Sequence, residues 1–170
     1  MMGAGKTAIG NQLARRLQMR FVDTDAEIES RTGVEVSLIF EIEGDAGFRR
    51  REAALIAALA QDSGLVVATG GGAILDANNR AQLRDNGVVV YLSANPELLL
   101  ERLRLDKKRP LLQVADRHQH LQDMHTLRDP LYRQVADIVI EGGSGSMQHL
   151  VAALERELRR WCPSLSSDAP

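Results

Sequence analysis

The stretch Gly3-Ala4-Gly5-Lys6-Thr7 decides the fold of this 170-residue chain. It carries the second half of the Walker A pattern, G-x-x-x-x-G-K-S/T, and leads directly into a helical pattern. Glycines let backbone N–H groups turn toward phosphates, and a helix N-terminus adds partial positive charge. We therefore expect this loop to bind ATP, with Lys6 at the β- and γ-phosphates and the Thr7 hydroxyl on Mg²⁺. A chance match at a helix start is the alternative.

Only two residues, Met1 and Met2, precede this loop in the sequence. The first glycine of the pattern would fall one residue before Met1, and no strand precedes the loop in the sequence. In a doubly wound sheet that strand would be central, so we expect open strand edges and uncovered apolar helix surface. A mis-assigned start or a shortened chain would explain this, and either would weaken ATP binding and stability.

Short β-branched runs alternate with longer helical patterns along the chain. Such alternation predicts βαβ units and a three-layer α/β/α fold, with helices on both faces of a parallel sheet. We expect strands at 19–22, 65–69, 88–92 and 136–140, and helices at 7–17, 47–61 and 147–161. One domain is expected over 1–162, followed by a disordered tail at 163–170.

The charge balance argues against polyanionic partners. Because 21 Lys and Arg face 23 Asp and Glu, we expect neither nucleic acid nor a membrane as partner. The single Cys162 cannot form an internal disulfide, and no apolar run approaches the roughly 20 residues that span a bilayer. The start does not resemble a signal peptide. A cytoplasmic monomer is the default expectation.

Two acidic residues follow the first expected strand. Asp23 and Asp25 stand at i and i+2, a spacing that points both side chains to one side of a sheet. The strand at 65–69 ends in T-G-G-G without the Walker B aspartate, so another carboxylate must serve the metal, and Asp23 is the nearest candidate. A helix N-cap is the alternative reading of such paired acids.

Two further motifs indicate a ligand. Arg49 and Glu52 are three residues apart on a predicted helix, where the acid can orient the guanidinium to bind a carboxylate. A solvated ion pair is the alternative. Gly70, Gly71 and Gly72 directly follow a buried strand, and their bare backbone can approach a ligand and donate N–H groups. A flexible turn between strand and helix is the alternative.

Six segments in this order resemble the shikimate kinases, and the resemblance runs from Met1 to about Val139. The segments are GAGKT (3–7), FVDTDAEIE (21–29), IFEIEGDAGFRRRE (39–52), ATGGGAIL (68–75), DKKRPLL (106–112) and RDPLYRQVAD (128–137). The resemblance implies a P-loop fold like that of nucleoside monophosphate kinases, with substrate-binding helices in the region 24–52 and a lid at 104–120.

The resemblance also assigns roles. It implies that Asp23 helps position Mg²⁺ and that Asp25 binds the substrate hydroxyls, where it can orient or deprotonate the attacking group. It implies that Arg49, held by Glu52, and Arg128 bind the substrate carboxylate, and it places the substrate against the turn formed by Gly70, Gly71 and Gly72.

Two arginines, Arg102 before the expected lid and Arg109 within it, complete the expected site. Arg109, in a Lys-Lys-Arg-Pro segment, looks like the lid arginine that would close over the transferred phosphoryl group, which makes Lys6, Asp25 and Arg109 the candidate catalytic residues. Arg102 resembles the arginine that packs on adenine, although a solvated helix face explains it nearly as well. His118, His120 and His125 lack the spacing of a metal site.

The resemblance implies an ATP- and Mg²⁺-dependent enzyme that phosphorylates the 3-hydroxyl of shikimate, in the pathway to chorismate and the aromatic amino acids. Another small P-loop kinase acting on a carboxylate-bearing substrate, such as gluconate kinase, is the nearest alternative. A non-catalytic nucleotide-binding protein is a second alternative, which the missing glycine and strand would favour.

Overall fold

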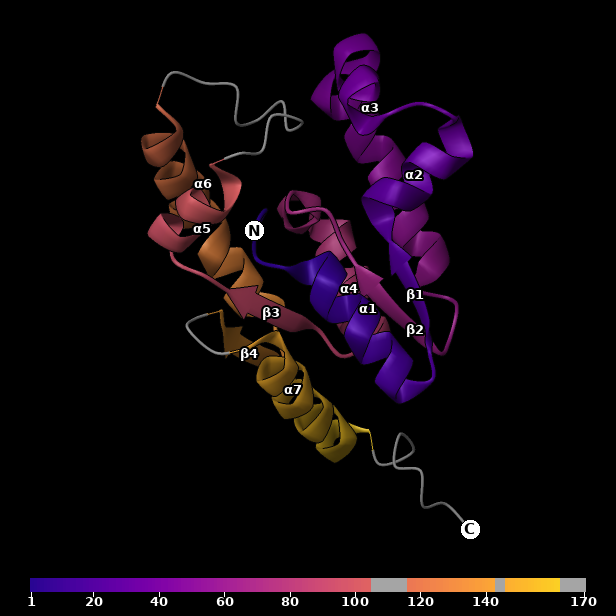
Figure 1. The fold of residues 1–170 in the computed structure, drawn as a ribbon. Helices are drawn as coiled ribbons and strands as arrows, with labels where there is room; N and C mark the ends of the chain where they lie inside the picture. The colour runs from indigo at the N-terminus through magenta and orange to yellow at the C-terminus, as the bar shows by residue number, and fades with distance from the viewer. Residues whose placement is uncertain (105–115, 143–145, 163–170) are drawn as a thin grey trace.

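Helices and short strands alternate along the chain (Figure 1). The computed structural model describes residues 1–104, 116–142 and 146–162. In chain order the elements are α1 Lys6–Leu17, β1 Arg20–Asp23, α2 Thr24–Thr32, α3 Val36–Leu59, β2 Leu65–Ala68, the 3-10 helix η1 Ala73–Leu75, α4 Ala77–Asn86, β3 Val90–Ser93, α5 Pro96–Leu103, α6 Arg117–Val135, β4 Ile138–Glu141 and α7 Met147–Trp161.

All four of these strands pair in parallel, which confirms the predicted α/β class. β1 pairs with β2, and Arg20 lies opposite Leu65 at the first register position. β3 pairs with β4, and Val90 lies opposite Ile138. Each strand falls within two residues of the range expected from its β-branched run.

The strands form two pairs rather than one continuous sheet. Within the described ranges β2 bonds to β1 alone and β3 to β4 alone, so no strand joins β2 to β3. Figure 1 shows β2 and β3 on opposite sides of α1.

Side-chain caps account for helices that periodicity alone did not reveal. The Asp76 carboxylate accepts hydrogen bonds from the first-turn amides of α4. Asn95 caps α5, which begins at Pro96, and Asp116 caps α6. These are residue types that favour helix starts because their side chains satisfy otherwise unpaired N–H groups.

Gly44 interrupts α3. Its φ of 69° and ψ of −178° lie in a region that is open essentially to glycine alone. The expected helix at 47–61 is therefore the second part of a longer element that begins at Val36.

Two apolar clusters hold these elements together. One lies among α1, α5, α6, α7 and the β3–β4 pair, and includes the fully buried Leu99, Leu121 and Val151. The other joins β1, α2 and α3 through residues such as Ile28 and Leu55. No helix among the described residues is both long enough and apolar enough to cross a membrane.

Candidate active site

The Gly3–Thr7 loop turns into α1 through two left-handed glycines. Gly3 has a φ of 73° and Gly5, the N-cap of α1, has a φ of 91°. No side chain caps this helix, so its first N–H groups point toward the loop without a side-chain acceptor. The Lys6 Nζ donates a 2.9 Å hydrogen bond across the loop to the Met1 carbonyl. The geometry is that of an anion-binding helix start.

Thr7 and Asp23 meet beside this loop. The Thr7 hydroxyl donates a 2.7 Å hydrogen bond to one oxygen of Asp23. The other oxygen accepts from the amides of Asp25 and Ala26, so Asp23 is also the N-cap of α2. Asp23 therefore caps α2 with one carboxylate oxygen and contacts Thr7 with the other. A hydroxyl and a carboxylate form a donor set that suits Mg²⁺, which keeps waters and phosphates as its remaining ligands.

Arg49 and Glu52 form a sequestered ion pair on α3. The Nη1 of Arg49 donates a 2.5 Å hydrogen bond to Glu52, whose side chain has 0% exposure. The guanidinium carbon lies 5.2 Å from the centre of the Phe48 ring. Burial raises the pKa of Glu52, although Arg49 counteracts this. Because the acid is fully buried, the reading as a solvated surface pair is excluded.

The three-glycine turn is held from two sides. The Gly70 amide donates to the buried hydroxyl of Thr24 at 3.0 Å. On the other side, the Gly71 carbonyl accepts from Arg128 at 3.2 Å and from the Tyr132 hydroxyl at 2.6 Å. A Cβ at Gly72 would collide with the Arg49 guanidinium. The turn is therefore fixed against α2, α3 and α6. This contradicts the alternative that it is only a flexible turn between strand and helix.

A cavity of about 110 Å³ joins these elements. It is lined by the predicted residues Asp25, Arg49, Gly70, Gly71, Gly72 and Arg128, together with Glu52, Met2, Val36, Phe40 and Phe48. Arg128 is 6% exposed, and its Nε has no hydrogen-bond partner among the described residues. Buried donors are normally satisfied, so this guanidinium is placed to receive an anionic oxygen.

The other predicted residues do not line this cavity, but Lys6 is linked to it through the glycine turn. Lys6 lines a smaller neighbouring cavity together with Gly70 and Gly71, so the glycine turn is common to both. Asp23 and Thr7 line neither. The Nη1 of Arg102 lies 3.4 Å from the Gly3 carbonyl, at the edge of the phosphate loop.

Most of the expected lid, including Arg109, lies outside the described residues, as does the tail at 163–170. The last part of the expected lid, residues 117–120, is instead the first turn of α6, which Asp116 caps. No cluster of three or more His, Cys, Asp or Glu side chains suited to a metal is found in 1–104, 116–142 and 146–162.

Sequence reasoning missed several residues of the site. The apolar wall formed by Val36 and Phe40, and the two hydroxyls of Thr24 and Tyr132 that hold the glycine turn, were not named. Tyr132 lies four residues after Arg128, on the same face of a helix. That spacing was the available signal for it.

Comparisons with known proteins agree with this geometry. The family model described as shikimate kinase matches residues 2–159. Shikimate kinase of Aromatoleum aromaticum is 53% identical over 161 residues, which cover 95% of this chain and 92% of the relative. Shikimate kinase of Dechloromonas aromatica is 52% identical, over 94% of this chain and 87% of the relative.

Solved structures show the same similarity. The shikimate kinase of Acinetobacter baumannii, solved in complex with shikimate, superposes with a TM-score of 0.91 at 46% identity, over 95% of this chain and 90% of that one. The enzyme of Aquifex aeolicus superposes with a TM-score of 0.79 at 27% identity, over 96% and 94% of the two chains. With a phosphate loop, an arginine-lined cavity and these matches along nearly its whole length, the chain belongs to the shikimate kinase family.

Proposed function

We propose that this protein transfers the γ-phosphate of ATP to the 3-hydroxyl of shikimate, forming shikimate 3-phosphate and ADP. The observation that carries the proposal is the cavity that brings Arg49, Arg128 and Asp25 together against the glycine turn, directly beside the Lys6 loop. Two guanidinium groups suit a carboxylate, and one carboxylate suits a hydroxyl.

The carboxylate of the acceptor is held by the two arginines. Glu52 fixes the Arg49 guanidinium at 2.5 Å, and Phe48 packs against it, so the cation is oriented before the acceptor arrives. A preorganised guanidinium loses little side-chain entropy on binding. The apolar wall that includes Phe40 faces the carbon ring of the acceptor.

Asp25 holds the attacking hydroxyl. It lies in the first turn of α2 and lines the cavity beside Gly70. The hydroxyl oxygen forms a bond to the γ-phosphorus while the bond to the bridging oxygen of ADP breaks, and Asp25 orients the hydroxyl and accepts its proton. This reaction depends mainly on positioning and charge stabilisation, which a fixed cavity supplies.

The phosphates of ATP lie on the loop and on the start of α1. Lys6 exchanges its hydrogen bond to the Met1 carbonyl for the β- and γ-phosphates. Arg102, whose guanidinium lies at the Gly3 carbonyl, packs against adenine, and Arg109 closes over the transferred group.

Thr7 and Asp23 hold Mg²⁺ in our proposal, supported by their 2.7 Å contact and by their oxygen donors. When bound, the cation neutralises charge on the phosphates. We also propose that the protein is a cytoplasmic monomer in which residues 1–162 form one domain.

Assay of the purified protein with ATP, Mg²⁺ and either shikimate or gluconate tests the function. We expect ADP and a new phosphate ester, detected by ³¹P NMR, with shikimate alone. Phosphorylation of gluconate instead would assign the alternative kinase reaction. Binding of ATP without turnover of either acid would indicate a nucleotide-binding protein. The Lys6→Met variant serves as the background control.

A further inference from the structure

The buried polar and charged side chains of the described residues gather around one turn. They are Thr24, Glu52, Asn79 and Arg128. Three of them hydrogen-bond to the backbone of the segment 70–73, and the carboxylate of Glu52 would collide with a Cβ added at Gly70. Burying a polar group is unfavourable unless its hydrogen bonds are made. Polar burial in this part of the chain is therefore concentrated where it fixes the backbone of 70–73.

Asn79 holds the end of this segment from α4. The residue lies in the first turn of α4 and is 2% exposed. Its Nδ2 donates a 3.1 Å hydrogen bond to the Ala73 carbonyl, which can only accept. The neighbouring Arg80 donates to the carbonyls of Ile74 and Leu75 at 2.8 and 3.1 Å. Two side chains of α4 therefore hold η1 through its three carbonyl groups.

Thr24 holds the opposite end of the segment. Its hydroxyl accepts from the Gly70 amide at 3.0 Å, and the residue is fully buried. Thr24 is the first residue of α2 and stands between Asp23 and Asp25, so this bond sets where the turn begins relative to both acids. The Ala73 amide donates to the Gly70 carbonyl at 3.2 Å. The two ends of the segment are therefore joined to each other as well.

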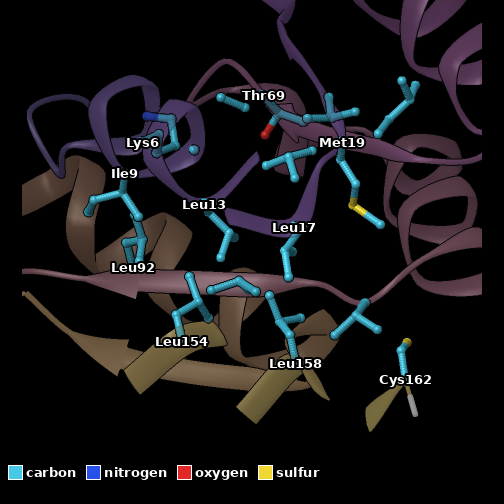
Figure 2. Close-up of a pocket in the computed structure, with 17 residues that line it drawn as sticks. Lys6, Ile9, Leu13, Leu17, Met19, Thr69, Leu92, Leu154, Leu158 and Cys162 are labelled. Carbon is cyan, nitrogen blue, oxygen red and sulfur yellow. The ribbon is translucent and has the colours of Figure 1, made fainter. Parts of the chain in front are cut away.

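The turn lies between the acceptor cavity and the phosphate loop. Gly70 and Gly71 line the acceptor cavity and also the smaller cavity that Lys6 lines. Figure 2 shows Thr69, the residue before the turn, and Lys6 on the same side of a further cavity whose lining is mainly aliphatic. A displacement of the turn would therefore move an acceptor relative to the phosphates, and phosphoryl transfer depends on this alignment.

We propose, on the basis of the proposed function, that Asn79 and Thr24 are positioning residues that hold the two ends of the glycine turn for acceptor binding. Neither side chain lines the acceptor cavity, so each acts through the backbone that it holds. A turn that is fixed before binding loses little conformational entropy when the acceptor arrives. Loss of either contact should therefore chiefly weaken the binding of shikimate.

Asn79→Asp tests the contact with η1. The carboxylate has nearly the size of the amide but cannot donate to the Ala73 carbonyl. Asn78→Asp is the matched control, because Asn78 is exposed and gains the same charge in the same helical turn. We expect Asn79→Asp to raise the KM for shikimate about 3- to 10-fold with an unchanged KM for ATP. Asn78→Asp should change neither.

Thr24→Val tests the other end, because valine keeps the branched shape of threonine without its hydroxyl. It should raise the KM for shikimate to a similar extent, and Thr24→Ser, which keeps the hydroxyl, should raise it much less. A role in stability alone would lower Tm in Asn79→Asp and Thr24→Val without changing this KM, and that result would overturn the proposal.

Hydrogen exchange measured without ATP or shikimate tests the positioning separately. In Asn79→Asp the Gly70 amide, at the far end of the turn, should exchange about tenfold faster than in the native protein. In Thr24→Val the same is expected of the Ala73 amide. Unchanged exchange at the far end in both variants would overturn the proposal. If the native protein failed to phosphorylate shikimate, the proposed function would be wrong, and exchange would still decide whether Asn79 and Thr24 hold the turn.

Discussion

The Tyr132 hydroxyl lies 2.6 Å from the carbonyl oxygen of Gly71 and donates a hydrogen bond to it. Burial raises the pKa of Tyr132 to about 12, so the phenol remains a donor at neutral pH. Arg128, one helical turn earlier on α6, donates to the same oxygen at 3.2 Å. If Arg128 binds the acceptor as we propose, Tyr132 can hold the glycine turn alone.

Tyr132→Phe should raise the KM for shikimate about 3- to 10-fold with a smaller change in kcat, because the turn loses its second anchor. Stability should fall by about 1 kcal/mol. Tyr91→Phe is the control, since it removes a buried hydroxyl bonded to Asp129 instead. If both variants raised KM equally, a general packing effect would replace this explanation.

Arg49→Lys should raise the KM for shikimate about 10- to 100-fold, although the positive charge is kept. Lysine lacks the planar fork that contacts Glu52 and stacks on Phe48. Arg50→Lys, on the exposed side of the same helix, should leave KM unchanged. Steady-state kinetics with shikimate varied at saturating ATP gives the result, and an unchanged KM in Arg49→Lys would contradict the assigned carboxylate site.

Lys6→Met should lower kcat about 100- to 1,000-fold, because the charge that develops on the phosphates loses its cation. The fold should persist, since the hydrogen bond from Lys6 to the Met1 carbonyl joins residues only five positions apart at the start of the chain. Arg15→Met removes an exposed cation from the same helix and should not change kcat. Loss of activity in both would point to the helix rather than to Lys6.

Asp23→Asn should raise the Mg²⁺ concentration needed for half-maximal activity about 10-fold or more. Asparagine caps helices as well as aspartate does, so α2 and Tm should be retained. The measurement is a Mg²⁺ titration at fixed ATP, with circular dichroism as the check on folding. A normal Mg²⁺ requirement would leave Asp23 as a helix cap alone.

Glu52 should make stability depend on pH. Burial raises its pKa above the ordinary 4.5, so the folded state binds more protons than the unfolded state, and stability falls as pH rises through the folded pKa. The difference in Tm between the native protein and Glu52→Gln should therefore decrease as pH rises above 4.5.

Glu155 provides a control of opposite sign. Its hydrogen bond from Arg159 lowers its pKa, so it stabilises the fold above the ordinary 4.5 and loses this effect as pH falls. The difference in Tm between the native protein and Glu155→Gln should increase as pH rises from about 3 to 5. Equal slopes for the two variants would contradict the assigned burial of Glu52.

The four strands and the helices α1 and α7 could be predicted from the sequence. Runs such as Val88–Leu92 predict parallel strands because both faces of such strands are buried. Four helices, α2, α4, α5 and α6, were not assigned individually. The helix α4, Ala-Asn-Asn-Arg-Ala-Gln-Leu-Arg-Asp-Asn, has few apolar residues to give a stripe, and its start depends on the Asp76 cap.

The polar part of the site was predictable because its residues stand in short motifs. Arg49 and Glu52 are neighbours on a helix, and Gly70 to Gly72 are consecutive. The apolar wall was not, since Val36 and Phe40 reach the cavity only through the path that α3 takes in three dimensions. The roles of Asp25, Arg109 and the other site residues remain predictions.

The break at Gly44 divides α3 into two segments that contribute different kinds of side chain to the cavity. Before it, Val36 and Phe40 line the cavity; after it, Arg49 and the buried Glu52 contribute an ion pair to the same cavity. The two segments nevertheless pack together across the break, because the Phe40 and Phe48 rings stack with centroids 4.6 Å apart and the Arg49 guanidinium carbon lies 6.0 Å from the centre of the Phe40 ring. Substitution of Phe40 should therefore disturb the packing of Arg49 as well as the wall of the cavity, so the apolar and charged parts of this site are coupled.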